Sequence, residues 1–254
     1  MIVLRSRSEI DKIRTACRIV AEVLQRLCAM VQPGVTTADL DRRAEEWARE
    51  QKAQPAFKGY AVGGRVFPST LCVSIDEEIV HGMPSPKRVL RDGAIVGLDF
   101  GVIYEGYYGD GAVTIPVGNV SEEADRLMRV TRESLDRGIE RLQIGNRIRD
   151  VSAAIQNHAE SHGYGVVRDF VGHGIGRRLH EEPQVPNYVA PGANPRLKEG
   201  MVLAIEPMVC EGTYEVEMLD DGWTAVTRDR RRAAHFEHSV AVTADGPEVL
   251  TLAA

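Results

Sequence analysis

Four carboxylates interrupt segments of this chain that otherwise have the apolar pattern of buried β-strands. An isolated ionised carboxylate among apolar residues is very costly, so such groups are normally paired or bound to a metal. Together the four carry a charge of about −4, which two divalent cations would neutralise. With one histidine between glycines, the set predicts a two-metal hydrolase. The five residues are Asp99, Asp110, His173, Glu206 and Glu237.

Asp99 and Asp110 are expected to lie on two strands of one hairpin. The turn signal at 104–106 predicts that strands 95–102 and 107–115 pair. If the hairpin centre lies between residues 104 and 105, paired positions sum to 209, and since 99 + 110 = 209 the two aspartates stand directly opposite. Opposed like charges need a positive partner. The alternative is a solvated pair on an exposed sheet face, which the flanking glycines disfavour. Alternation turns four apolar side chains to the core: Val96, Leu98, Phe100 and Val102.

The remaining three residues each admit a second interpretation. Taken alone, the sequence Gly-His-Gly around His173 is more typical of a turn histidine, and its spacing is not that of a short zinc pair. Pro207 implies that Glu206 ends a strand beside a cavity. Glu206 and Glu237 could instead form structural salt bridges with arginines, the candidates being Arg177, Arg178 and Arg228. A donor set of carboxylates and one imidazole suits Mn, Fe(II), Co or Zn.

The hydrophobic pattern predicts an α+β fold in which a helix–helix–strand order occurs twice. Helices are expected at 8–30, from 37 through Trp47, at 121–142 and at 149–162. Strands are expected at 71–75, 94–102, 111–117, 166–171, 202–208, 214–218 and 236–242, with a loop at 59–68. Asp99 and Glu206 are offset by 206 − 99 = 107 residues, and the segments 34–39 and 145–150 by 145 − 34 = 111. These similar offsets predict two pseudo-twofold halves around one central site, in a single domain 1–254.

Composition limits the classes of partner. The chain has 254 residues and a net charge of −6, which disfavours DNA or anionic membranes as partners. No run approaches the roughly 18 apolar residues of a membrane span, and the first residues lack the apolar core of a signal peptide. The four cysteines are scattered without CxxC pairing. A reduced, cytoplasmic protein is expected.

The order of the five candidate ligands resembles the dinuclear metal site of type 1 methionine aminopeptidases of the bacterial kind. The long insertion of the type 2 enzymes is absent here, because His180 and Glu206 are only 206 − 180 = 26 residues apart. The resemblance covers essentially the whole chain and implies the "pita-bread" fold. Its most specific motifs are Ile79–Pro84 (IVHGMP), Gly172–Asn187, Ile205–Val209 (IEPMV), Asp221–Thr224 (DGWT) and Phe236–His238 (FEH).

This resemblance implies a role for each residue of the site. Asp99 would hold one divalent ion, His173 and Glu206 the other, and Asp110 and Glu237 would bridge both. Glu206 would also be the general base, and His180 would hydrogen-bond the scissile carbonyl. His81 would contact the peptide nitrogen or the backbone near the scissile bond. The methionine pocket would be formed by Tyr60, Phe67, Cys72, His81 and Trp223, although core packing is the alternative for each aromatic residue taken alone.

The resemblance also implies a substrate and partners. The substrate would be the N-terminal methionine of peptides and nascent chains, with a small second residue preferred. The ribosome is a candidate partner, and a monomer is expected. The alternatives are an X-Pro aminopeptidase or dipeptidase, a creatinase-like hydrolase, and a non-catalytic peptide-binding protein of the same fold. Four positions depart from the family pattern near the site: Phe57, Gly111, Leu179 and His235.

Overall fold

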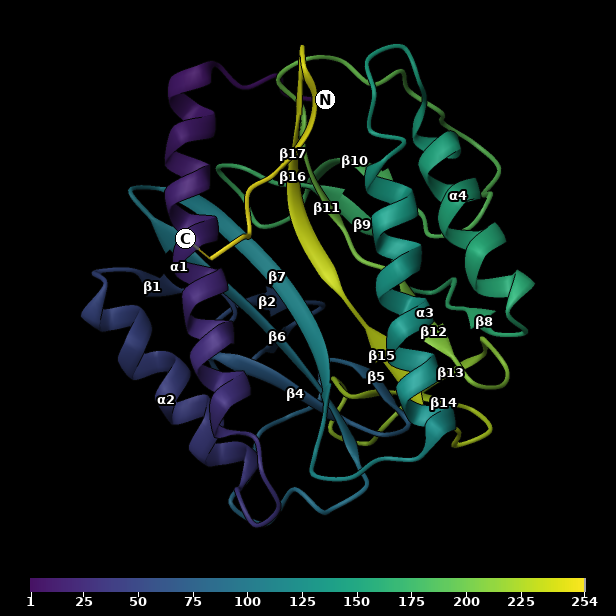
Figure 1. Ribbon diagram of the computed structural model, residues 1–254. Helices are drawn as coiled ribbons and strands as arrows, with labels where there is room; N and C mark the ends of the chain where they lie inside the picture. Colours follow the sequence, from purple (N-terminus) through teal and green to yellow (C-terminus); the bar gives the residue numbers. More distant parts are fainter. Residues whose placement is uncertain (254) are drawn as a thin grey trace.

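Four helices pack in two pairs against a curved antiparallel sheet (Figure 1). The computed structural model describes residues 1–253. The helices are α1 (Arg7–Met30), α2 (Thr37–Glu50), α3 (Glu122–Ile139) and α4 (Ile148–Ser161). Each helix begins and ends within a few residues of a helix expected from the sequence, so all four predictions are confirmed. Among the described residues, no helix is long and apolar enough to cross a membrane.

Side-chain caps explain where three of the helices begin. Ser6 and Glu9 form a capping box at α1, satisfying backbone N–H groups that have no partner within the helix. Thr36 accepts a hydrogen bond from the Asp39 N–H at α2, and Ser121 accepts one from Ala124 at α3. The helix starts expected near residues 8, 37 and 121 therefore follow from local chemistry.

The main sheet has nine strands in the order β1-β6-β7-β16-β11-β9-β10, with β4 paired to β6 and β17 paired to β16. Its strands are β1 (Gln54–Pro55), β4 (Leu71–Ile75), β6 (Ile95–Tyr104), β7 (Tyr107–Pro116), β9 (Gly172–Gly174), β10 (Glu181–Val185), β11 (Val202–Ile205), β16 (Glu237–Thr243) and β17 (Gly246–Val249). The smaller sheets contain β2 (Ala61–Val62), β3 (Arg65–Val66), β5 (Glu78–Val80), β8 (Gly165–Val166), β12 (Met208–Cys210), β13 (Val216–Met218), β14 (Ala225–Thr227) and β15 (Ala233–His235).

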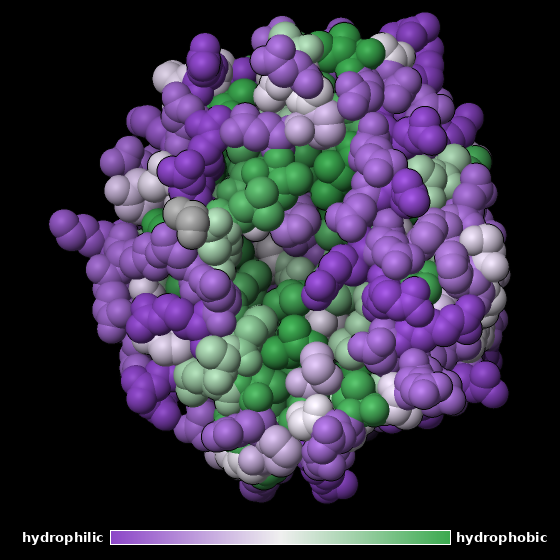
Figure 2. Space-filling view, viewed as in Figure 1, coloured by the Kyte–Doolittle hydropathy of each residue, from purple (hydrophilic) through white to green (hydrophobic). Residues whose placement is uncertain are grey.

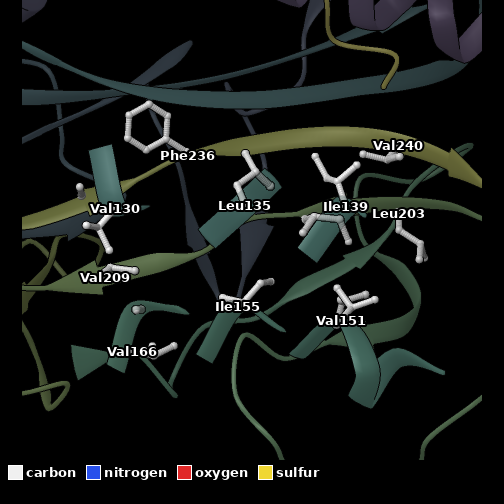
Figure 3. Close-up of a cluster of buried hydrophobic side chains, with 14 of the residues drawn as sticks. Val130, Leu135, Ile139, Val151, Ile155, Val166, Leu203, Val209, Phe236 and Val240 are labelled. Atoms are coloured by element: carbon white, nitrogen blue, oxygen red, sulfur yellow. The ribbon is translucent and has the colours of Figure 1, made fainter. Parts of the chain in front are cut away.

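Each helix pair forms a core with its own half of the sheet. Helices α1 and α2 pack on β4 and β6, where Val96, Leu98, Phe100 and Val102 are fully buried, as their alternation predicted. Helices α3 and α4 pack on β11, β12 and β16 (Figure 3). Polar side chains cover the helices on the face shown in Figure 2, and apolar ones gather in the band between the two pairs. Pairing of β7 with β16 joins the two halves.

The β6–β7 hairpin corrects the predicted register. Its turn is Glu105-Gly106, both with positive φ (48° and 78°), so Tyr104 pairs with Tyr107 and paired positions sum to 211. Asp110 therefore lies opposite Gly101 rather than opposite Asp99. The predicted direct opposition of the two aspartates is wrong. Because the error is two residues, both side chains still belong to the same face of the sheet, as diagonal neighbours.

The second half contains more breaks than its sequence pattern suggested. The expected strand 202–208 ends at Ile205, and the chain resumes as β12 in a different sheet, because Glu206-Pro207 interrupts the ladder. The strand expected at 166–171 is largely wrong: only Val166 of this range is in a strand, at the end of β8, and β9 begins after it at Gly172. The loop expected at 59–68 contains the two-residue strands β2 and β3. Six further strands were not predicted: β1, β5, β10, β14, β15 and β17. All but β10 have two to four residues, too few to show a clear alternation, and the register of β10 is broken between Glu181 and Gln184.

Candidate metal centre

The five acid and histidine residues singled out in the sequence line one cavity of about 520 Å³. Asp99 and Asp110 come from β6 and β7, His173 from β9, Glu206 from the end of β11, and Glu237 from the start of β16. Residues from both halves of the chain therefore meet at the centre of the sheet. The other predicted site residues line the same cavity: Tyr60, Phe67, Cys72, His81, His180 and Trp223.

Three of these side chains already lie close enough to share one cation. Asp110, His173 and Glu237 each place a ligand atom within 4.8 Å of the other two, and all three residues are buried. Glu206 extends the group, with its Oε1 3.5 Å from Nε2 of His173. The Nδ1 of His173 lies 3.0 Å from the carbonyl oxygen of Gly174. Since a carbonyl only accepts, Nδ1–H donates to it and leaves a lone pair on Nε2 for a metal.

Unsatisfied oxygens show that the residues present fit a bound metal. Oδ1 of Asp99 and Oε1 of Glu237 are buried without a hydrogen-bond partner. Such atoms are rare in folded proteins unless a water or ion completes them. Asp99 lies outside the three-residue group but lines the same cavity. Oxygen donors with one imidazole nitrogen suit Mn, Fe(II), Co or Zn.

The site favours protonated carboxyl groups when no cation is bound. Burial raises the pKa of Asp99 to about 7. Burial, and then repulsion from the other acids, raises the pKa of Asp110, Glu206 and Glu237 well above the ordinary carboxyl value. Burial also lowers the pKa of His173 to about 3, so this imidazole is neutral and ready to bind a metal. The electrostatics therefore favour exchange of protons for cations.

Protein that a chelator has freed of metal should release protons when a divalent metal is added at about pH 6. Ordinary carboxyl groups are almost fully deprotonated at that pH and would release very few protons. Because the carboxyl pKa values are raised, metal affinity should increase as the pH rises through the pKa of Asp99, about 7. Calorimetric titration in two buffers of different ionisation enthalpy counts the released protons. Asp99→Asn should release fewer of them. Binding without proton release in the wild type would contradict the assignment of these carboxylates as ligands.

His180 and His81 border the cavity as hydrogen-bonding groups. Tyr60 Oη lies 2.6 Å from His180 Nδ1, and the His180 ring meets the His173 ring edge-on at 4.4 Å between centroids. When the Tyr60 hydroxyl donates to Nδ1, the proton of the neutral His180 ring is on Nε2. Burial lowers the pKa of His180, and it lowers the pKa of His81 to about 4. Both rings are therefore neutral donors at neutral pH.

The residues expected around a methionine side chain form an apolar wall. Phe67 and Trp223 pack edge to face with ring centroids 5.3 Å apart. Phe67 and Cys72 belong to a buried cluster against which Tyr60 and Trp223 pack. Phe57 and Leu179, two positions that depart from the family pattern, lie in the same cluster and line the cavity.

An ion pair from the N-terminus holds the loop that carries His180. Arg5 Nη2 donates to Glu181 Oε2 at 2.5 Å, and both side chains are at most 7% exposed. The other carboxylate oxygen of Glu181 accepts from the backbone N–H groups of Arg177 and Arg178, at 2.9 and 3.1 Å. Glu181 therefore connects the segment before α1 to the turn that precedes His180.

His235 also lines the cavity, although the sequence indicated it only as a departure from the family pattern. Its Nε2 is buried without a hydrogen-bond partner and lies 3.8 Å from Glu206 Oε2. Burial lowers the pKa of His235 to about 3. Its position two residues before Glu237 was the available signal, since strand residues two apart point to the same face. Among the described residues, none of the arginines considered as partners forms an ion pair with Glu206 or Glu237. Glu206 instead lies beside two neutral rings, with Nε2 of His173 at 3.5 Å and Nε2 of His235 at 3.8 Å from its carboxylate oxygens.

Comparison with known proteins places this chain in a family. The model of metallopeptidase family M24 matches residues 11–244. The chain is 53% identical to a methionine aminopeptidase of Clostridium acetobutylicum over 99% of both sequences. The structure of a methionine aminopeptidase from Thermotoga maritima superposes with a TM-score of 0.95 at 46% identity, covering 99% of this chain and 100% of that one.

A more distant relative, a peptidase with another named activity, has the same fold. An Xaa-Pro dipeptidase from Bacillus anthracis gives a TM-score of 0.79 at 25% identity, and the match covers 98% of this chain but 61% of that one. The pita-bread fold expected from the sequence is confirmed by these matches. Sequence and structure together identify the chain as a member of metallopeptidase family M24, within the methionine aminopeptidases.

Proposed function

We propose that this protein is a metal-dependent aminopeptidase that hydrolyses the first peptide bond after an N-terminal methionine. The observation that carries this proposal is the cluster of Asp110, His173 and Glu237 at the end of a cavity with an apolar wall. The full-length similarity to methionine aminopeptidases supports the same reaction. When bound, divalent cations supply Lewis acidity toward the scissile carbonyl and lower the pKa of water.

Glu206 is the proposed proton carrier. Its carboxylate lies beside the proposed ligands, with Oε1 3.5 Å from Nε2 of His173, and a bound cation would keep it ionised and able to accept a proton. In this role Glu206 takes the proton of the attacking water and delivers it to the leaving amine. Asp99, Asp110, His173, Glu206 and Glu237 would hold the metals. The free α-amino group of the substrate enters among these ligands, which restricts cleavage to the terminal residue.

His180 is proposed to donate a hydrogen bond to the oxygen of the scissile carbonyl. The bond between Tyr60 Oη and His180 Nδ1 leaves the Nε2 proton for this contact. His81 is proposed to contact the peptide nitrogen. The methionine side chain would lie against Tyr60, Phe67, Cys72, His81 and Trp223, where sulfur contacts aromatic rings favourably.

His180→Ala should lower kcat/KM by about 100- to 1,000-fold, the usual effect of removing an oxyanion donor. Its metal content should remain that of the wild type, because His180 is not a ligand in this proposal. Tyr60→Phe is the matched control: it keeps the imidazole and removes only the hydroxyl that fixes its tautomer, so its loss should be smaller. Steady-state kinetics with metal analysis of both variants tests this, and an unimpaired His180→Ala enzyme would refute the assignment.

A two-peptide assay distinguishes the proposed function from its nearest rival. Met-Ala-Ser should be cleaved efficiently and Ala-Pro-Ala poorly. The reverse preference would identify an X-Pro peptidase, the activity named for the Bacillus anthracis relative of the same fold. Met-Leu-Ser should be cleaved more slowly than Met-Ala-Ser if a small second residue is preferred. A protein without activity or bound metal after reconstitution with Mn, Co or Fe(II) would instead be a binding protein.

The proposal also includes metal identity, assembly and location. We infer two divalent ions per chain, drawn from Co, Mn, Fe(II) and Zn, because the donor set accepts each of them. The protein is proposed to act as a monomer in the cytoplasm on nascent chains, with the ribosome as a candidate partner. Elemental analysis combined with gel filtration of the purified protein tests the metal count and the monomer.

A further inference from the structure

A second group of metal-binding side chains lies on the helical layer, away from the catalytic cavity. Glu133 is on α3, His158 is in the last turn of α4, and His162 caps the end of α4. Each offers a ligand atom within 4.8 Å of the other two, and all three residues are half-buried. None of them lines the cavity that contains the M24 residues.

The two histidines are arranged as a pair. They are four residues apart at the end of one helix, a spacing that brings side chains to the same face. Their ring centroids lie 4.6 Å apart. Nδ1 of His162 lies 2.8 Å from the carbonyl oxygen of His158, so Nδ1–H donates to that carbonyl. The lone pair is therefore on Nε2, and such a backbone contact is typical of histidines that bind metals.

Glu133 contributes one oxygen from the neighbouring helix. Its Oε2 lies 3.0 Å from Nε2 of His158, and its Oε1 lies 3.6 Å from Nη1 of Arg129. Arg126, the other nearby cation, is engaged with the His162 carbonyl and the Tyr164 ring. The arginines thus leave Oε2 facing the histidines. In the metal-free protein, Nε2–H of His158 donates a hydrogen bond to Oε2 of Glu133. A metal ion bound between the two residues would replace that proton.

We propose that Glu133, His158 and His162 form a second, independent metal site that binds one zinc-class cation. Two imidazoles and one carboxylate are a zinc donor set, with a water molecule in the fourth position. Distances of up to 4.8 Å between ligand atoms require only a small closure of the side chains to reach ordinary zinc geometry. The ion would link α3 to α4, the two helices that cover the second half of the sheet.

The test counts zinc bound to the full-length enzyme. Wild-type protein, H158Q/H162Q and a Glu199→Gln surface control are dialysed against the same micromolar free zinc and analysed by elemental analysis. Wild type and the control should each hold one zinc equivalent more than H158Q/H162Q. Methionyl-peptide cleavage after reconstitution with Mn should be equal in all three, which shows that each variant is folded. Equal zinc contents in the wild type and the double variant would overturn the proposal.

Two further variants separate this site from the catalytic one. His173→Ala should lose zinc from the catalytic cavity and still hold the equivalent that depends on His158 and His162. Glu133→Gln should weaken the second site at least about tenfold, since even the loss of a residue supporting a ligand costs that much. Unchanged zinc affinity in Glu133→Gln would overturn the three-ligand site.

Discussion

Glu237→Ala should reduce hydrolysis of Met-Ala-Ser by about a thousandfold or more, because a bound metal contributes several kcal/mol to transition-state stabilisation. Glu237 is buried at the start of β16, with an oxygen that has no hydrogen-bond partner, and is proposed to be a metal ligand. Asp99→Ala should reduce hydrolysis by a comparable factor, because it removes a ligand of one of the two proposed metals. The measurement is kcat/KM together with metal content at a fixed free-metal concentration.

The fold should survive these substitutions, since without a metal Glu237 keeps a buried carboxyl oxygen that has no hydrogen-bond partner, and its removal relieves that cost. Melting curves recorded in chelator should therefore show that Glu237→Ala is at least as stable as the wild type. Glu215→Ala is a suitable control, because this carboxylate is half exposed and pairs only with Arg228 among the described residues. Normal turnover by Glu237→Ala would refute the assignment of Glu237 as a metal ligand.

Gly109→Ala should lower the free energy of unfolding by about 3 kcal/mol, the upper end of the usual cost of overpacking. Gly109 lies in β7 where the strand meets α1, and a Cβ there would lie 2.6 Å from the backbone of Ala16 and Cys17. Backbone atoms of a long helix cannot move aside as a flexible side chain can. The expected fall in melting temperature is roughly 6–12 °C for a chain of this size.

Gly97→Ala provides the matched control for Gly109→Ala. It adds the same methyl group to the paired strand β6, and the new Cβ would have its nearest neighbour at 3.6 Å, an ordinary contact. Its stability should stay within about 1 kcal/mol of the wild type, since glycine in a strand interior is itself mildly unfavourable. Thermal unfolding of both variants in chelator makes the comparison. Equal stabilities for the two would show that α1 tolerates a larger separation from β7.

The helices could be predicted because their signals are local. Ser6, Thr36 and Ser121 mark helix starts with their own side chains, and the apolar spacing defines the buried faces. The hairpin register was predicted with an error of two residues because the turn places Glu105 at positive φ, where asparagine or glycine is usual. The sequence around 104–106 therefore gave no strong indication of the turn's true centre.

The candidate metal centre was predictable for a different reason. Carboxylates in apolar strands are so unfavourable that Asp99, Asp110, Glu206 and Glu237 pointed to a cation before any fold was known. The roles of His81, His180 and the pocket residues required the family resemblance, because nothing local distinguishes them from core residues. The cluster of Glu133 with two histidines was not predicted at all, since it depends on how α3 packs against α4.

The ion pair between Arg5 and Glu181 has a consequence for how the protein unfolds. Its partners are 176 residues apart in the sequence. Contacts between such distant segments form late, after most of the chain-ordering entropy has been lost. Interactions that are absent from the folding transition state act mainly on the unfolding rate. This pair should therefore slow the opening of the His180 loop, and it contributes to the lifetime of the active enzyme more than to its rate of folding.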